Sequence, residues 1–142
     1  MMHVFVDTNI LLDIIEGRQK FLLASSNVFD LGITGQIQMF ATPLTFANCA
    51  YTARKNVGYD NAIQGLKALK RYVKATTMDD EQVENALNSC MPDFEDMLQY
   101  EAALDAKCDV IVTRDKKRHF PKDGSIPILS PEDFLNLFFA KE

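Results

Sequence analysis

One short stretch near the N-terminus constrains the fold more than any other part of the chain. The apolar residues 4–6 run directly into Asp7-Thr8-Asn9, and an amphipathic helical pattern begins at Ile10. A short apolar run with β-branched residues predicts a buried strand. Because ligands of open α/β sheets bind outside the carboxyl ends of the strands, the stretch predicts a carboxylate, that of Asp7, at an edge where it could hold a cation.

The rest of the chain alternates between strand and helix patterns. This alternation predicts one α/β domain over residues 1–142, with a parallel sheet covered by helices on both faces. The two most apolar strands, 3–6 and 109–113, should be central. Further strands are expected at about 37–41, 73–76 and 127–129, and helices at about 10–16, 20–32, 42–55, 60–72, 79–90, 93–107 and from 130 onward.

Composition excludes several classes of protein. The apolar and charged fractions, 47% and 25%, are those of an ordinary globular domain. The chain has no apolar run of about 18 residues and no pattern typical of a secretory signal, so we expect a cytoplasmic protein without a membrane span. A net charge of −5 argues against duplex binding by bulk electrostatics, although metal-binding carboxylates in a nuclease would also lower the total. The three cysteines are widely spaced and are expected to be free thiols.

Asp7 has two interpretations of equal weight from its position alone. Hard cations such as Mg²⁺ prefer carboxylate oxygens, which favours a metal ligand. Asp is also well suited to cap the N-terminus of the following helix. Thr8 and Asn9 fit either interpretation, as hydrogen-bond partners of a ligand or as cap residues.

Two further acidic positions come later in the chain. Asp93 and Asp96 are three residues apart and lie on one face of a predicted helix, where they could cap it, bind metal, or do both. Glu95 points away from that face and is expected to be solvated. Asp115 follows the second buried strand, as Asp7 follows the first, although a surface turn residue is the alternative.

The remaining charged residues are expected to be less specialised. A basic run beside Asp115 is usually a solvated face, but next to an acidic metal site it could bind phosphates; it comprises Arg114, Lys116, Lys117 and Arg118. Nine other aspartates lack comparable positions and are expected to be solvated or capping: Asp13, Asp30, Asp60, Asp79, Asp80, Asp105, Asp109, Asp123 and Asp133.

Three segments together resemble the PIN-domain family of nucleases, which includes the VapC-like toxins. VFVDTNILLD (residues 4–13) resembles the opening motif of the family, and DFEDMLQ (93–99) resembles its mid-chain acidic helix. DVIVTRDKK (109–117) resembles its late strand and final acid. The segments match in order and spacing over nearly the whole chain.

The resemblance implies a three-layer fold with a five-stranded parallel sheet, and Mg²⁺- or Mn²⁺-dependent hydrolysis of phosphodiester bonds, most often in RNA. Carried over by position, Asp7, Asp96 and Asp115 would be the metal-site acids. Thr8 would support them, and Asp93 would lie close by. Membership of a toxin–antitoxin pair would add a small antitoxin partner, and PIN domains commonly form homodimers.

One position departs from the family pattern. The family usually carries a glutamate in the helix after the second strand, where this chain has Asn48.

The three matching segments make a metal-dependent endoribonuclease that cleaves single-stranded or looped RNA the leading hypothesis. The alternative is a PIN-like fold with weakened catalysis that binds RNA or a protein. A phosphoacceptor domain of the receiver type fits less well, because each strand end carries a single acid rather than a pair.

Overall fold

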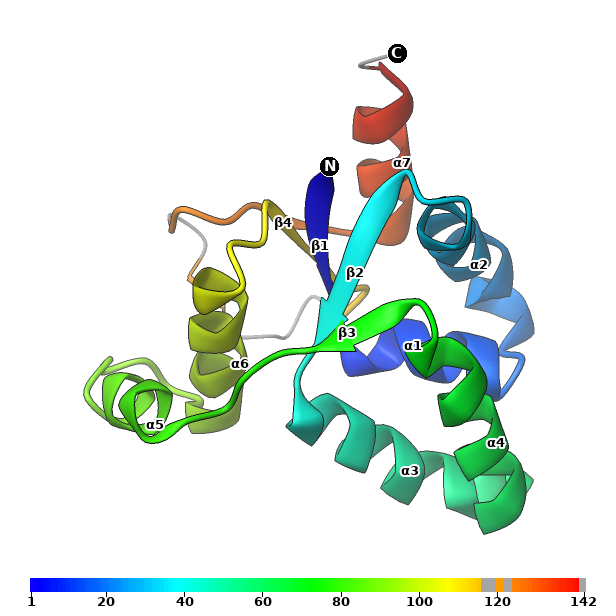
Figure 1. Ribbon diagram of the computed structural model, residues 1–142, viewed down its shortest axis with the longest axis horizontal. Helices are drawn as coiled ribbons and strands as arrows, with labels where there is room; N and C mark the ends of the chain where they lie inside the picture. The colour runs from blue at the N-terminus through cyan, green and yellow to red at the C-terminus, as the bar shows by residue number, and fades with distance from the viewer. Residues whose placement is uncertain (116–119, 122–123, 141–142) are drawn as a thin grey trace.

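The central feature of the computed structural model, which describes residues 1–115, 120–121 and 124–140, is a five-stranded parallel sheet (Figure 1). Its strand order is β3-β2-β1-β4-β5, and β1 pairs with β2 on one side and β4 on the other. The elements are β1 (Met2–Val6), α1 (Thr8–Ile15), α2 (Gln19–Ile33), β2 (Ile37–Ala41), α3 (Pro43–Val57), α4 (Tyr59–Lys70), β3 (Val73–Ala75), α5 (Asp80–Leu87), α6 (Phe94–Asp105), β4 (Val110–Val112), β5 (Ile128–Leu129) and α7 (Pro131–Ala140).

Successive residues of each central strand feed opposite faces of the sheet, because side chains alternate along a strand. Val4 and Val6 belong to the larger apolar core, whereas Phe5 belongs to a second core on the other face. The larger core is covered by α1, α2, α3, α4 and α7, and the smaller one by α5 and α6 (Figure 1). Residues 4–6 of β1 and 110–112 of β4 are therefore all apolar and buried, as strands covered on both faces require.

Local sequence signals set the helix ends. Thr42 caps α3 by accepting a hydrogen bond from the Thr45 N–H at 2.9 Å, and Pro43 occupies the first turn. Asp79 caps α5 and forms a reciprocal capping box with Gln82. Within the described residues, no helix is both long enough and apolar enough to cross a membrane.

The main expectations for the fold are confirmed. The sheet is parallel and covered on both faces, β1 is central, and β4 lies next to it. β2 has the expected bounds, and β5 is an edge strand. α5 is shorter than expected and ends at Leu87, three residues before Cys90, which adopts a positive φ of 60° that a helix does not allow.

Candidate metal centre

Asp7 lies at the carboxyl end of the central strand and is completely buried. Its Oδ1 accepts a hydrogen bond from the Thr8 N–H at 2.7 Å, which caps α1. Its Oδ2 accepts from the Thr113 hydroxyl at 2.7 Å and from the Asn9 side-chain amide at 3.4 Å. The capping interpretation is thus confirmed, and these same neutral donors would hold the carboxylate in place as a ligand. That second role stays a prediction.

Thr113 connects the ends of the two central strands. β1 and β4 pair in register at Val6 and Val112, so the residues that follow them are neighbours. Besides donating to Asp7, the Thr113 hydroxyl accepts from the Asp115 N–H at 3.1 Å and from the Asn9 amide at 3.2 Å. The structure therefore brings the backbone of Asp115 close to the Asp7 carboxylate through one side chain.

Sequence reasoning did not single out Thr113, although a signal existed. A hydroxyl at the end of an otherwise apolar strand can only be satisfied by a polar neighbour at the sheet edge. Asn9 reinforces the same turn, because its Oδ1 accepts from the Arg114 N–H at 3.2 Å.

The acidic helix α6 supplies the next pair of carboxylates. Asp93 caps it by accepting from the Asp96 N–H at 2.9 Å, so its capping role is confirmed. Asp96 itself is 2% exposed. The positive end of the helix dipole lowers the free-energy cost of a buried carboxylate at this position.

Side chains of α3 contact both α6 and the residue that follows the end of β1 and Asp7. The Cys49 thiol donates to the Thr8 carbonyl at 3.8 Å. One residue earlier, the Asn48 amide donates to Glu95 at 2.9 Å. The expectation that Glu95 is solvated is wrong, since it is half-buried against Asn48. A single turn of α3 thus contacts both Thr8, next to Asp7, and Glu95, next to Asp96.

The donor chemistry of this edge fits a hard divalent cation. All the acids are oxygen donors of the kind that Mg²⁺ and Mn²⁺ prefer. The buried Thr8 hydroxyl, adjacent to Asp7, also has no hydrogen-bond partner among the described residues. In that same part of the chain, no three His, Cys, Asp or Glu side chains are already grouped to hold an ion. Carboxylates repel one another without a cation between them, so we expect such a ligand set to close only around the ion.

A second acidic residue of the opening motif has a role that the sequence did not reveal. Asp13 was expected to be solvated or capping, but it is completely buried. Arg114 contacts both carboxylate oxygens of Asp13 at 2.7–3.1 Å, Ser25 donates to it at 2.8 Å, and Arg18 lies 3.8 Å away. The sequence separation of 101 residues hid this pairing.

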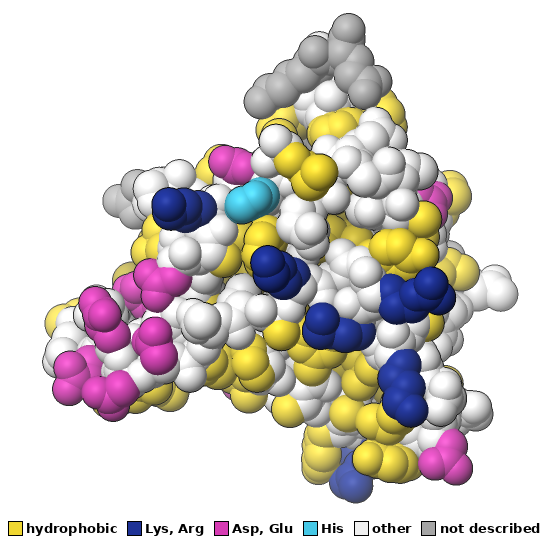
Figure 2. All heavy atoms as spheres, in the orientation of Figure 1, with side chains coloured by type: hydrophobic (Ala, Val, Ile, Leu, Met, Phe, Trp, Pro, Cys, Tyr) yellow, Lys and Arg dark blue, Asp and Glu magenta, His cyan; other side chains and the backbone are white. Residues whose placement is uncertain are grey.

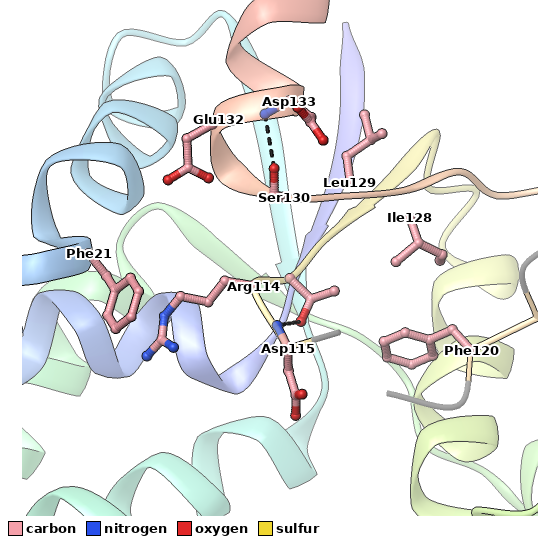
Figure 3. A pocket seen from close by; sticks show the side chains of 10 residues that line it. Phe21, Arg114, Asp115, Phe120, Ile128, Leu129, Ser130, Glu132 and Asp133 are labelled. Carbon is pink, nitrogen blue, oxygen red and sulfur yellow. Dashed lines mark hydrogen bonds between the residues drawn. The ribbon is translucent and has the colours of Figure 1, made fainter. Parts of the chain in front are cut away.

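Arg114 is held on its other side by an aromatic ring. Its guanidinium lies 3.7 Å from the centre of the Phe21 ring, and the hydrogen bonds to Asp13 raise its pKa. In Figure 3 the Arg114 side chain points toward Phe21, whereas the Asp115 carboxylate points away from it. A role for Arg114 in binding nucleic acid stays a prediction, and Lys116, Lys117 and Arg118 lie outside the described residues.

A cavity of about 560 Å³ opens beside Asp115 (Figure 3). Thr113, Arg114 and Asp115 form one wall, and Phe120 and the start of α7 form others. Its position at the ends of β4 and β5 is where ligands of parallel α/β sheets bind.

Charge is unevenly spread over the surface. Figure 2 shows Lys and Arg side chains gathered over α4 and β3, and Asp and Glu side chains gathered over α5. The exposed basic residues of the first region are Lys67, Lys70, Arg71 and Lys74. The net negative charge therefore coexists with a basic surface at one edge of the sheet.

Comparison with protein-family models matches residues 3–117 to the PIN domain. The comparison with curated proteins found no significant match.

Solved structures with similar folds include proteins of toxin–antitoxin systems. The toxin–antitoxin complex from Klebsiella pneumoniae has a chain with TM-score 0.66 and 18% identity, covering 90% of this chain and 97% of that one. VapBC2 from Rickettsia felis, bound to a DNA fragment from its promoter, gives TM-score 0.65, 15% identity, and coverage of 89% and 97%. VapC20 from Mycobacterium tuberculosis, a toxin that cleaves the sarcin–ricin loop, has a TM-score of 0.61 and 11% sequence identity. The match covers 84% of this chain and 91% of that one. At these identities the likeness concerns the fold.

Proposed function

Because the chain belongs to the PIN domain family, a family of nucleases, we propose that it is a metal-dependent endoribonuclease. Asp7, Asp96 and Asp115 would hold Mg²⁺ or Mn²⁺, with Asp93 nearby. Thr8, Asn9 and Asn48 would orient these acids. The observation that carries the proposal is the Thr113 hydroxyl, which hydrogen-bonds both the Asp7 carboxylate and the Asp115 N–H at the edge where the two central strands end.

The residues of this chain would prepare the site for hydrolysis. When bound, a divalent ion lowers the pKa of water and stabilises negative charge on the phosphate. The neutral donors around Asp7 fix the direction of its oxygens, so little reorganisation is needed when substrate arrives. The cavity offers space for part of a nucleotide next to Asp115, the one proposed metal-site acid that lines it, and Glu132 and Asp133 line it as well. Single-stranded or looped RNA suits such a site, because its backbone can bend into it.

The basic residues would position the RNA backbone. Lys116, Lys117 and Arg118 follow Asp115 directly in the sequence. Phosphate contacts of this kind weaken as salt is added, because binding releases condensed counterions. We expect cleavage to become slower between 50 and 200 mM salt, on the order of tenfold for each few phosphate contacts.

The test is cleavage of a single-stranded RNA with Mn²⁺ or Mg²⁺, with a chelator as the metal-free arm. We expect the wild type to cut and Asp7→Asn to lose about 100-fold or more in rate, since a metal ligand is removed. Asp30→Asn is a matched control, because Asp30 is an exposed aspartate on α2. Equal rates for the wild type and Asp7→Asn would contradict the proposal.

The alternative, an RNA- or protein-binding module with weakened catalysis, is favoured by the uncharged Asn48. It predicts RNA binding without any metal-dependent cleavage. Calorimetric titration with Mn²⁺ separates the two, because the binding module needs no ion at Asp7.

We also propose a cytoplasmic homodimer that pairs with a small antitoxin. The toxin–antitoxin assemblies among the structural neighbours support this partner. Light scattering of the purified protein, alone and after co-expression with a small protein encoded beside it, tests both assemblies. A monomer that forms no complex would contradict this part of the proposal.

A further inference from the structure

We propose that Glu95 is a fourth acidic ligand of the divalent-ion site, held in place by Asn48. This inference rests on the proposed metal-dependent function. It concerns the position where the family pattern predicts a glutamate and the chain has an amide. The carboxylate would thus come from α6 instead of α3, with the two helices in contact at that point.

The contact between the two side chains carries the inference. The Asn48 Nδ2 donates to the Glu95 Oε1 at 2.9 Å, across a separation of 47 residues in the sequence. Both side chains are half-buried. A carboxylate accepts at both oxygens, so the bond to Oε1 orients the group while Oε2 remains able to bind a cation.

Along α6, Glu95 adjoins two other acids, and its side chain is turned toward Asn48 of α3. Glu95 lies in the first turn of α6, directly before the buried Asp96 and two residues after the cap residue Asp93. Three carboxylates in one helical turn repel one another, and the helix dipole offsets only part of that cost. A cation bound between α6 and β1 would reduce this repulsion further.

The turn of α3 that carries Asn48 also reaches the end of β1. Its neighbour Cys49 contacts the carbonyl of Thr8, whose hydroxyl is buried without a partner in the described part of the chain. An unsatisfied buried hydroxyl next to Asp7 is an independent sign that a polar ligand belongs at this edge. One turn of α3 therefore contacts Thr8, next to Asp7, through Cys49 and contacts Glu95 through Asn48.

The inference makes an exchange experiment possible. If Asn48 and Glu95 act as a unit, the charge can move from one helix to the other without loss of the site. The double variant Asn48→Glu/Glu95→Gln has an unchanged net charge and should place the carboxylate on α3. Glu95→Gln alone removes the charge and keeps nearly the same shape.

The measurement is Mn²⁺ affinity by isothermal titration calorimetry on the full chain, with thermal unfolding to verify that each variant folds. We expect Glu95→Gln to weaken Mn²⁺ binding at least about tenfold, and the double variant to recover most of that loss. Glu84→Gln, on the exposed face of α5, is the matched control and should bind as the wild type does.

The outcomes separate this inference from the function on which it rests. If Asp7→Asn abolishes Mn²⁺ binding but Glu95→Gln binds as the wild type does, only the role of Glu95 is overturned. A folded double variant that binds no better than Glu95→Gln would also overturn it. If the wild type binds no Mn²⁺ at millimolar concentration, the proposed function fails and this inference fails with it.

Discussion

Asp7 and Asp13 are both completely buried carboxylates of the same opening motif, but the fold treats them differently. Asp13 is balanced by the Arg114 guanidinium, with Arg18 and the Ser25 hydroxyl as further contacts. Among the described residues, the donors to Asp7 include a backbone N–H, a hydroxyl and an amide, which orient its oxygens.

The donors around a buried carboxylate distinguish a structural acid from a candidate ligand. Removing a buried acid that is paired with a guanidinium destabilises the fold, because it leaves the guanidinium as an uncompensated charge. A buried charge that is held by neutral donors is oriented for a cation.

Replacing Asp13 should cost the most stability. Asp13→Asn leaves the Arg114 guanidinium without its carboxylate in a partly buried site, so we expect the free energy of unfolding to fall by about 3–5 kcal/mol. Urea denaturation monitored by circular dichroism measures the change. Asp30→Asn, at an exposed position, should change the value by less than about 0.5 kcal/mol. A loss of less than about 1 kcal/mol in the free energy of unfolding for Asp13→Asn would contradict the structural role of Asp13 that distinguishes it from Asp7.

Replacing Asp7 should instead remove the response to metal. Without metal, Asp7→Asn should change the free energy of unfolding by no more than about 1.5 kcal/mol, since an amide oxygen can still cap α1. Mn²⁺ at 100 times its dissociation constant should stabilise the wild type by about 2.7 kcal/mol by mass action. Denaturation with and without Mn²⁺ measures both quantities, and an unchanged Mn²⁺ effect in Asp7→Asn would contradict the assignment.

Removing the Thr113 hydroxyl should remove hydrogen bonds around Asp7 and leave the contacts of Asp13 unchanged. Thr113→Val keeps the shape but leaves the Asp115 N–H and one oxygen of Asp7 short of a hydrogen bond. We expect a loss of about 1–3 kcal/mol in stability and a fall of about tenfold in Mn²⁺ affinity. Calorimetry and urea denaturation give the two values. Unaltered Mn²⁺ affinity would show that Thr113 does not position the acids.

The pKa of the Cys49 thiol should depend on the charge of Asp7. Burial raises the pKa of Cys49 to about 12, and the negative charges of Asp7 and Glu16 contribute to this increase. Above the unfolded pKa of about 8.5, the unfolded chain loses a proton that the folded chain keeps. The thiol therefore lowers stability as pH rises, by about 1.4 kcal/mol per pH unit.

Asp7→Asn should lower the pKa of Cys49 and so reduce this alkaline loss, whereas Asp13→Asn should not. Urea denaturation between pH 9 and 11 tests the difference. The measurement is best made in a Cys108→Ala background, because burial also raises the pKa of Cys108 to about 12. The same pH dependence in both aspartate variants would mean that Cys49 does not sense Asp7.

The sequence predicted those features that depend on local pattern. Apolar runs and turn residues located β1, β2 and β4, and the caps at Thr42, Asp79 and Asp93 follow from their immediate neighbours. The parallel order then follows from the alternation of strands and helices.

Features that depend on tertiary contacts could not be predicted in the same way. The Asp13–Arg114 pair and the Asn48–Glu95 pair join residues 101 and 47 positions apart, and no local pattern records which distant side chains meet. Glu95 was expected to be solvated because helical spacing turns it away from Asp96. The Asn48 side chain of α3 donates to Glu95 on that side, a contact that only the packed structure reveals.

The most direct test of the acidic site is a crystal structure of the wild type soaked in Mn²⁺, with anomalous scattering used to locate the ion. We expect an ion about 2.1 Å from carboxylate oxygens at the carboxyl edge of β1 and β4. Its ligands should include Asp7, Asp96 and Asp115. An ion bound elsewhere, or no bound ion at millimolar Mn²⁺, would contradict the claim that Asp7 anchors a metal centre.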